Sequence, residues 1–388
     1  MTLKAAKRSA IEPFIVMDVM RQANAREAQG EDVLHLEVGQ PSTSAPRHVL
    51  KAAQKAIDSE LLGYTDAFGV PLLKEAIAKH YLAAYDITID PSQVAVTTGS
   101  SGGFVLAFLS AFDAGDRVAL ASPGYPAYRN ILKALDIEVV NIEVGPKTNY
   151  QPTPELLSQI KGDLAGLIIA SPSNPTGTMI DDQGLKNLAD YCHDRGVRII
   201  SDEIYHGITY ENKASSMAQF SSDAFVVNSF SKYYSMTGWR LGWLIFPQDL
   251  SRPIECLAQN LFISPPTLSQ IAAVSAFDCE DELKASVKRY KVNRDILLKE
   301  LPKAGFKKLS HAEGAFYIYA DVSDLTNDSL VFCQYILTET GVAITPGVDF
   351  DVERGHQFVR FSFAGTTADI KMATTRLQDL NIKKNANR

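Results

Sequence analysis

The chain has 388 residues, a length that predicts two or three lobes rather than one simple core. It is 46% hydrophobic and 21% charged, as ordinary globular proteins are, and its net charge of −7 argues against nucleic-acid binding. No uninterrupted apolar run approaches the roughly eighteen residues that cross a bilayer. The N-terminal apolar stretch has no signal-peptide cleavage site, so we expect neither export nor a membrane partner.

The cysteines and histidines predict no metal site. The four cysteines are far apart and form no C-x-x-C pair, so they indicate neither zinc binding nor a disulfide framework. Reduced thiols and a cytoplasmic location are the simplest interpretation. The seven histidines form no metal or catalytic-triad pattern, and we interpret His206 as a structural or surface residue.

In chain order, residues 1–45 carry a strand-like run at 33–38 and are expected to pack on the C-terminal part. Residues 46–280 are predicted to form a large domain, in which short runs that are apolar on both faces alternate with helical stretches. This pattern predicts an α/β domain with a mostly parallel seven-stranded sheet flanked by helices. We expect strands at 94–97, 118–121, 139–142, 167–170, 197–200, 224–227 and 241–246, and helices at 103–112, 128–135 and 183–195.

Residues 281–388 have a different pattern and are predicted to form a smaller α+β domain. A long helical stretch at 281–301 comes first, and strand-like runs follow at 316–320, 342–344 and 358–363. The boundary near residue 280 is inferred from this change of pattern alone.

Five polar motifs each follow the end of a predicted strand of the large sheet. Open α/β sheets bind ligands at the carboxyl ends of their strands, so the motifs together predict one binding site. They are Gly99-Ser-Ser-Gly, Pro123-Gly-Tyr, Ser173-Asn-Pro-Thr-Gly, Asp202-Glu-Ile-Tyr and Ser229-Phe-Ser-Lys.

The last motif contains Lys232, which follows an apolar strand and lies among hydroxyl side chains. A lysine amine can form a Schiff base with an aldehyde cofactor if its environment lowers its pKa. Ser229, Ser231 and Arg240 could hold the phosphate of such a cofactor, Arg240 through a bidentate fork. On spacing alone, a surface lysine in a polar loop is an equally good interpretation.

These motifs, in this order, resemble the class I/II (fold-type I) pyridoxal-phosphate-dependent aminotransferases over essentially the whole chain. The resemblance implies pyridoxal 5'-phosphate held on Lys232 as a Schiff base. It also implies ping-pong transfer of an amino group between an L-amino acid and a 2-oxo acid. Asp202 matches the acid that pairs with the pyridine nitrogen, and Tyr205 and Asn174 match the groups that bind the ring hydroxyl. Without the resemblance, the motif around Asn174 is a plain β-turn.

The remaining cofactor contacts also rest on the resemblance. Gly99, Ser100 and Ser101 match the phosphate cradle of the family and lead into the helical run expected from residue 103, and the N–H groups at a helix start bind anions. Tyr125 matches the aromatic residue that stacks on the cofactor ring. Alone, the glycine-serine turn is weak evidence, and a tyrosine after Pro-Gly is more often simple turn packing.

Three further residues match the family's substrate and subunit contacts. Arg360 matches the arginine that binds the substrate α-carboxylate, although a structural ion pair would serve its charge equally well. Gly39 matches the backbone amide near the same carboxylate. Tyr64 matches a tyrosine that reaches the cofactor phosphate of the partner subunit, which implies a homodimer with shared active sites.

Other activities remain to be weighed. A carbon–sulfur β-lyase of the same fold is the main alternative, because fold alone does not select the reaction. We do not expect a DNA-binding sensor, because such a protein needs an additional N-terminal basic domain and the aminotransferase-like region begins almost at the first residue. We do not expect a dehydrogenase either, because no G-x-G-x-x-G motif follows the first strand of a βαβ unit. Ser101 stands where related aspartate aminotransferases have a lysine, and residues 13–17 are apolar. Both features favour a neutral, apolar or aromatic substrate, with glutamate or 2-oxoglutarate as one option for the other half-reaction.

Overall fold

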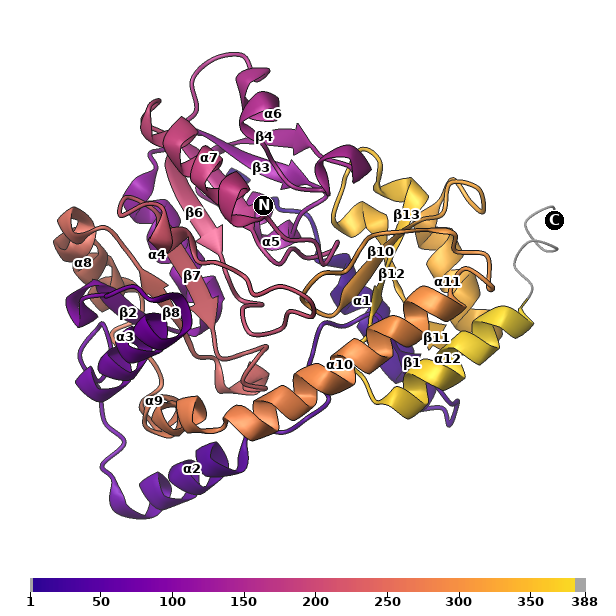
Figure 1. Cartoon of the computed structure of the whole chain (residues 1–388), viewed down its shortest axis with the longest axis horizontal. Helices are drawn as coiled ribbons and strands as arrows, with labels where there is room; N and C mark the ends of the chain where they lie inside the picture. The colour runs from indigo at the N-terminus through magenta and orange to yellow at the C-terminus, as the bar shows by residue number, and fades with distance from the viewer. Residues whose placement is uncertain (1–2, 381–388) are drawn as a thin grey trace.

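The computed structural model describes residues 3–380, which form two packed regions with the long helix α10 running between them (Figure 1). The larger region is built on a seven-stranded sheet with the order β2-β8-β7-β6-β5-β3-β4. Its strands are parallel except β8, which is antiparallel to both of its neighbours. The strands are β2 (Val94–Thr97), β3 (Arg117–Ser122), β4 (Glu138–Glu143), β5 (Gly166–Ala170), β6 (Arg198–Asp202), β7 (Phe225–Ser229) and β8 (Gly242–Ile245).

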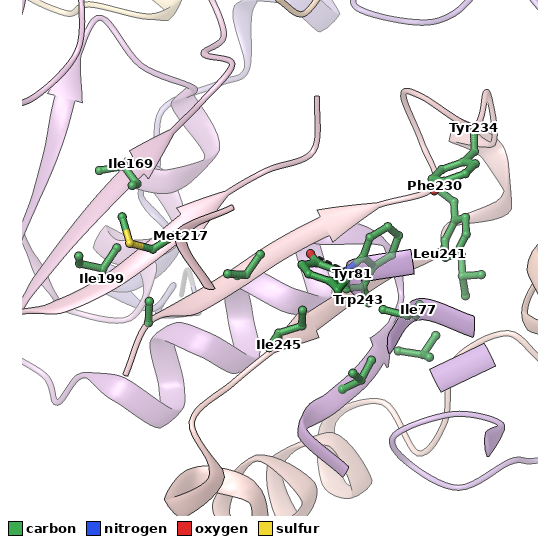
Figure 2. Close-up of a cluster of buried hydrophobic side chains, with 14 of the residues drawn as sticks. Ile77, Tyr81, Ile169, Ile199, Met217, Phe230, Tyr234, Leu241, Trp243 and Ile245 are labelled. Carbon is green, nitrogen blue, oxygen red and sulfur yellow. Dashed lines mark hydrogen bonds between the residues drawn. The ribbon is translucent and has the colours of Figure 1, made fainter. Parts of the chain in front are cut away.

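Apolar cores cover both faces of this sheet, because successive side chains of a strand point to opposite faces and most of those in the inner strands are apolar. Figure 2 shows one face, where the indole of Trp243 donates a hydrogen bond of 3.3 Å to the Tyr81 hydroxyl. The helices on this face are α2 (Arg47–Ser59), α3 (Pro71–Tyr85), α6 (Pro154–Ser158), α7 (Asp182–His193) and α9 (Thr267–Ala273). The opposite face is covered by α4 (Gly99–Ala111), α5 (Pro126–Ala134) and α8 (Ser251–Leu261).

The smaller region contains a four-stranded antiparallel sheet with the order β12-β13-β10-β9. Its strands are β9 (Lys308–Leu309), β10 (Tyr317–Asp321), β12 (Thr345–Pro346) and β13 (Phe358–Ser362). The helices packed around it are α1 (Ile15–Glu27), α10 (Glu280–Glu300), α11 (Ser329–Thr340) and α12 (Thr367–Asp379). None of the helices within residues 3–380 has the length and apolarity required to cross a bilayer.

The N-terminal segment joins the smaller region through β1 (Leu34–His35), which pairs in parallel with β11 (Val342–Ala343). Leu34 and Leu36 lie in the same apolar core as Phe361 and other residues of the smaller region. Because of this pairing, we propose that residues 3–45 belong with residues 281–380, and that residues 46–280 form the large domain; the remaining residues of the expected domains, 1–2 and 381–388, lie outside the described residues.

Three expected elements differ from those observed. The expected strand at 342–344 is two short strands, because Val342–Ala343 pairs with β1 whereas Thr345–Pro346 pairs with β13. The expected strand at 33–38 is only two residues long. The helix expected at 103–112 begins four residues earlier, at Gly99. The glycines in the first turns of α4 are weak helix formers. They allow α4 to pack closely on β7, because a Cβ on Gly103 would come within 3.2 Å of the Val227 side chain.

Candidate active site

The five polar loops lie at one edge of the large sheet. Strands β5, β6 and β7 are parallel neighbours, and their register pairs Ala170 with Asp202 and Asp202 with Val227. The loops that follow these strands carry Asn174, the rest of the Asp202 motif and Lys232. The carboxyl ends of neighbouring parallel strands are therefore adjacent, as the sequence pattern predicts.

Lys232 is partly buried and donates a hydrogen bond of 2.7 Å from Nζ to the carbonyl oxygen of Gly39. Burial and the nearby positive charges of Arg360 and Arg240 lower the pKa of Lys232 to about 8, although the carboxylate of Asp202 opposes the shift. A larger fraction of this amine is therefore unprotonated near neutral pH than for an ordinary lysine. Only the unprotonated amine can attack an aldehyde carbon.

Asp202 is buried at the end of β6 and accepts two hydrogen bonds. The backbone N–H of Ile204 donates to Oδ1 at 3.0 Å, and the Tyr128 hydroxyl donates to Oδ2. Burial raises the pKa of Asp202 to about 6, and the bonds from Tyr128 and Ile204 limit the rise because they stabilise the carboxylate. Asp202 is thus predominantly anionic at neutral pH, as a partner for a protonated ring nitrogen must be.

The start of helix α4 forms a site suited to an anion. The residue before the helix, Thr98, makes no side-chain capping bond, so the first backbone N–H groups are not capped by it. Arg240 lies against this helix end, since a Cβ on Gly99 would come within 2.5 Å of its guanidinium. Ser100 is partly buried here and Ser101 is exposed. Uncapped helix N–H groups beside a guanidinium are the donors that a phosphate group prefers.

Ser229 and Ser231 are buried and bonded to each other, with their hydroxyl oxygens 2.8 Å apart. The Ser229 hydroxyl also donates to the carbonyl oxygen of Leu241 at 3.0 Å. Leu241 directly follows Arg240, so this bond connects the end of β7 to the segment that carries the arginine.

Arg360, in the middle of β13, is a buried cation that forms hydrogen bonds with three other segments. Its guanidinium donates to Asn174 Oδ1 at 2.8 Å, to Thr345 Oγ1 at 3.2 Å and to the carbonyl oxygen of Glu37. Its Nε is buried and has no hydrogen-bond partner among the described residues. No carboxylate within residues 3–380 bonds to Arg360, so the alternative of a structural ion pair is wrong for the described chain. A buried guanidinium to which no carboxylate of the described chain is bonded is suited to bind an anionic ligand.

Tyrosines occupy the space between the Asp202 and Arg360 sites. The Tyr205 hydroxyl lies 2.8 Å from that of Tyr317, and both side chains are buried. The Tyr125 ring packs edge-to-face on Tyr128 at 5.3 Å and on Phe14 at 5.7 Å. The apolar N-terminal segment therefore reaches the loop that carries Tyr125.

Two residues lie apart from this cluster. Tyr64 is 84% exposed. His206 is buried, where Nε2 bonds to the Ser171 carbonyl oxygen at 3.0 Å and Nδ1 bonds to the Tyr85 hydroxyl at 2.7 Å. Burial lowers the pKa of His206 to about 3. Of the two expected placements for His206, the structural one is confirmed and the surface one is wrong.

The sequence did not single out three residues that touch the site: Tyr128, Tyr317 and Thr345. Tyr128 carried a local signal, because it lies three residues after Tyr125 and can occupy the same face of a helix. Tyr317 and Thr345 meet the site only through tertiary packing, and no short motif marks them.

The fold and its strand-edge lysine place this chain among the fold-type I pyridoxal-phosphate enzymes. A family model described as aminotransferase class I and II matches residues 31–377. A relative from Mycobacterium tuberculosis, named valine–pyruvate aminotransferase, is 52% identical over 381 residues, which are 97% of this chain and 98% of the relative. An aspartate aminotransferase from Pyrococcus horikoshii is 32% identical over 365 residues, which are 92% of this chain and 93% of the relative.

Solved structures agree with the family match. The crystal structure of an aminotransferase from Mycobacterium tuberculosis is 51% identical and has a TM-score of 0.96, covering 98% of this chain and 99% of that chain. The chain therefore belongs to the class I and II aminotransferase family. It is an aminotransferase that uses pyridoxal 5'-phosphate to transfer amino groups between amino acids and 2-oxo acids. The relatives and structure named above are aminotransferases, and none of them favours the carbon–sulfur lyase alternative.

The described residues fit this cofactor. The uncapped start of α4, with Arg240 against Gly99, suits the phosphate, and the anionic Asp202 suits a protonated ring nitrogen. The lowered pKa of Lys232 suits a bond to the aldehyde carbon. The phosphate, the ring nitrogen and the aldehyde carbon of the cofactor thus each have a suitable group at the carboxyl ends of the strands.

Proposed function

We propose that this enzyme transfers the amino group of a neutral, apolar L-amino acid such as valine to a 2-oxo acid such as pyruvate. The observation that carries the transfer between an amino acid and a 2-oxo acid is the buried guanidinium of Arg360, which within residues 3–380 has no carboxylate partner and no partner at Nε. Amino acids and 2-oxo acids share an α-carboxylate, so one guanidinium can bind both substrates of a ping-pong reaction.

Each residue of the cluster has a proposed role. Lys232 would carry the cofactor, and its amine would move a proton from the substrate α-carbon to the cofactor in one half-reaction and in the opposite direction in the other. Asp202 keeps the ring nitrogen protonated, while Tyr205 and Asn174 bind the ring hydroxyl, and Tyr125 packs on the ring. When bound, the cofactor supplies an electron sink that makes the α-hydrogen acidic.

The remaining residues are proposed to bind the cofactor phosphate and the substrate carboxylate. The start of α4 with Ser100 and Ser101 holds the phosphate, together with Arg240 and the Ser229 and Ser231 pair. Gly39 lies at the carboxylate end, where its carbonyl oxygen accepts the hydrogen bond from Lys232. A lysine released by an incoming amino acid therefore has an acceptor beside the substrate carboxylate site.

The charges around Lys232 favour a substrate without a second carboxylate. Only two cations within residues 3–380 lower the pKa of Lys232, namely Arg360 and Arg240. Arg360 is assigned to the substrate α-carboxylate, and Arg240 is assigned to the cofactor phosphate. Ser101 and the Phe14 ring bring no positive charge that could pair with a distal carboxylate. The 52% identical relative is named as acting on valine and pyruvate, which agrees with this reasoning.

A homodimer with shared active sites is the proposed assembly. Tyr64 is 84% exposed beside other exposed apolar side chains, including Leu61 and Leu62, so a second copy can cover this segment. An open groove of about 670 Å³ lies next to the phosphate site and is lined in part by Trp239 and Arg240. We propose that the partner's Tyr64 enters the groove and reaches the phosphate.

We also propose a cytoplasmic location. Cys192, Cys279 and Cys333 are buried as free thiols, Cys256 is partly buried, and none of them forms a disulfide. Free thiols are the common state of cysteine in a reducing compartment.

The substrate proposal is tested on the cofactor-loaded enzyme, to which single L-amino acids are added while the absorbance of the cofactor is followed. We expect valine to convert the cofactor at least about tenfold more efficiently than aspartate, because a buried carboxylate without a partner costs a few kcal/mol. Pyruvate should restore the original spectrum. A tenfold preference for aspartate over valine would contradict the proposed substrate class but not the family.

A further inference from the structure

Tyr317, the first residue of β10, joins three parts of the site that are far apart in the sequence. Its hydroxyl lies 2.8 Å from the Tyr205 hydroxyl, and the Arg360 guanidinium lies over its ring at 4.3 Å. Gly39 packs so closely on it that a Cβ there would overlap the phenol oxygen. Tyr317 therefore contacts residues assigned to the cofactor ring, the substrate carboxylate and the Lys232 acceptor.

The hydroxyl pair limits how Tyr205 can act. Within residues 3–380, neither hydroxyl has another hydrogen-bond partner. Burial raises the pKa of both phenols, so both carry their proton near neutral pH. A hydroxyl has one hydrogen to donate. If Tyr205 donates that hydrogen to an oxygen of the cofactor ring, the bond between the tyrosines must be donated by Tyr317.

The ring of Tyr317 acts on a second group. It lies against one face of the Arg360 guanidinium, and the Phe350 ring lies 4.7 Å from the same guanidinium. Aromatic rings attract a cation over their faces, and this attraction is stronger in a buried site. With this contact in place, the guanidinium still donates to Asn174, Thr345 and the carbonyl oxygen of Glu37.

We propose that Tyr317 is a positioning residue that couples the cofactor-ring site at Tyr205 to the carboxylate site at Arg360. Its hydroxyl donates to Tyr205, which strengthens the hydrogen bond that Tyr205 gives to the ring oxygen. Its aromatic face holds Arg360 in place. This inference rests on the roles proposed above for Tyr205 and Arg360.

The role of the Tyr317 hydroxyl is tested with Tyr317→Phe, which removes the hydroxyl and keeps the ring. The measured quantity is the midpoint pH of the spectral change that the bound cofactor shows on titration. A weaker bond from Tyr205 leaves more negative charge on the ring oxygen, which then retains a neighbouring proton to higher pH. We expect the midpoint to rise by roughly 0.3 to 1 unit, because linked hydrogen bonds polarise one another. The KM values should stay within about twofold, since the ring still faces Arg360.

The ring is tested with Tyr317→Leu, which removes the aromatic face. We expect KM for both the amino acid and the 2-oxo acid to rise about tenfold, as loss of a buried cation–π contact predicts. The matched control is Tyr319→Phe, two residues along the same strand. The Tyr319 hydroxyl is buried and has no hydrogen-bond partner within residues 3–380, so its removal should leave the midpoint unchanged.

An unchanged midpoint in Tyr317→Phe would overturn the hydroxyl's role, whether or not Tyr317→Leu folds. An equal shift in Tyr319→Phe would do the same, because the effect would then be a general consequence of altering this strand. Failure of the function proposed above would give results that differ from both of these outcomes. In that case, the unaltered enzyme would lack a titrating cofactor spectrum, or Arg360→Lys would leave KM unchanged.

Discussion

The cofactor half and the carboxylate half of the active site are built in different ways. In the cofactor half, Asp202 and Lys232 lie at or just after the ends of adjacent parallel strands. In the carboxylate half, Arg360 meets the Glu37 carbonyl oxygen across 323 residues of sequence and Asn174 across 186. The first half thus follows from the topology of one sheet, whereas the second depends on long-range contacts within the smaller region and, through Asn174, on the packing of the two regions.

This difference leads to an expectation about kinetics. Changes in the cofactor half should act mainly on kcat, because those residues control the protonation of the cofactor and the substrate. Changes in the carboxylate half should act mainly on KM, because those residues bind both substrates equally in the ground and transition states. The five variants below can confirm or break that division, and they run from the largest expected effect to the smallest.

Lys232→Ala should lower kcat by at least roughly 10⁴-fold, because it removes both the cofactor attachment and the proton carrier. Turnover with valine and pyruvate measures this, and circular dichroism should show an unchanged fold. Retained turnover would remove Lys232 from its central role.

Asp202→Asn should lower kcat by roughly 10²- to 10³-fold, because the neutral amide no longer favours the protonated ring. The side chain keeps its shape, so cofactor binding should persist and KM should change little. Single-turnover rates with valine measure the effect. A large rise in KM at near-normal kcat would contradict the division between the two halves.

Arg360→Lys should raise KM for valine and pyruvate together by roughly 10- to 100-fold, because lysine keeps the charge but loses the fork of N–H donors. Steady-state kinetics with each substrate measure it. Arg376→Lys is the matched control, since Arg376 pairs with Asp32 at the surface. A rise for only one of the two substrates would mean that Arg360 is not the shared carboxylate site.

Tyr128→Phe tests the pH dependence of the cofactor half. The Tyr128 bond stabilises the charged form of Asp202, whose pKa is about 6, so its removal should raise that pKa further. Asp202 would then take up a proton at higher pH, and kcat should begin to fall at a pH higher by about half a unit to one unit. The acid limb of the kcat profile measures this shift. A shift toward lower pH would contradict the assigned direction of the Tyr128 hydrogen bond.

Tyr64→Ala should weaken cofactor affinity by only a few-fold, since one exposed hydrogen bond is lost. Mixed dimers of this variant with Lys232→Ala sharpen the test. If Tyr64 completes the partner's site, one site of each mixed dimer combines an intact Lys232 with an intact Tyr64. Cofactor affinity at that site should be normal. Weak affinity at every active site of the mixed dimers would mean that Tyr64 acts within its own chain.

The sequence was sufficient for most of the large sheet and for the cofactor half. Each of its seven strands was expected within about two residues, because buried strands are short and apolar on both faces. The start of α4 was missed because glycines at its first turn oppose helix formation in isolation, while close packing on Val227 requires them. Tertiary packing thus determines where α4 begins, although the local helix propensity is unfavourable there.

The carboxylate half was only partly predictable. Arg360 could be found because a charge within an apolar strand stands out, but nothing local indicated Thr345 or Tyr317. The run at 342–344 was read as one strand, since apolar composition does not reveal that the chain changes sheets between Ala343 and Thr345. Residues whose role depends on long-range contacts carry little signal in a single sequence.

The most direct test of the central claim is to find the residue that carries the cofactor. Enzyme loaded with pyridoxal 5'-phosphate would be reduced with borohydride, which makes the bond between lysine and cofactor permanent, then digested and analysed by mass spectrometry. We predict that the mass of the reduced cofactor appears on the peptide that contains Lys232, and that valine added before reduction prevents the labelling. Label on a different lysine, or none on any peptide, would contradict the assignment of this site.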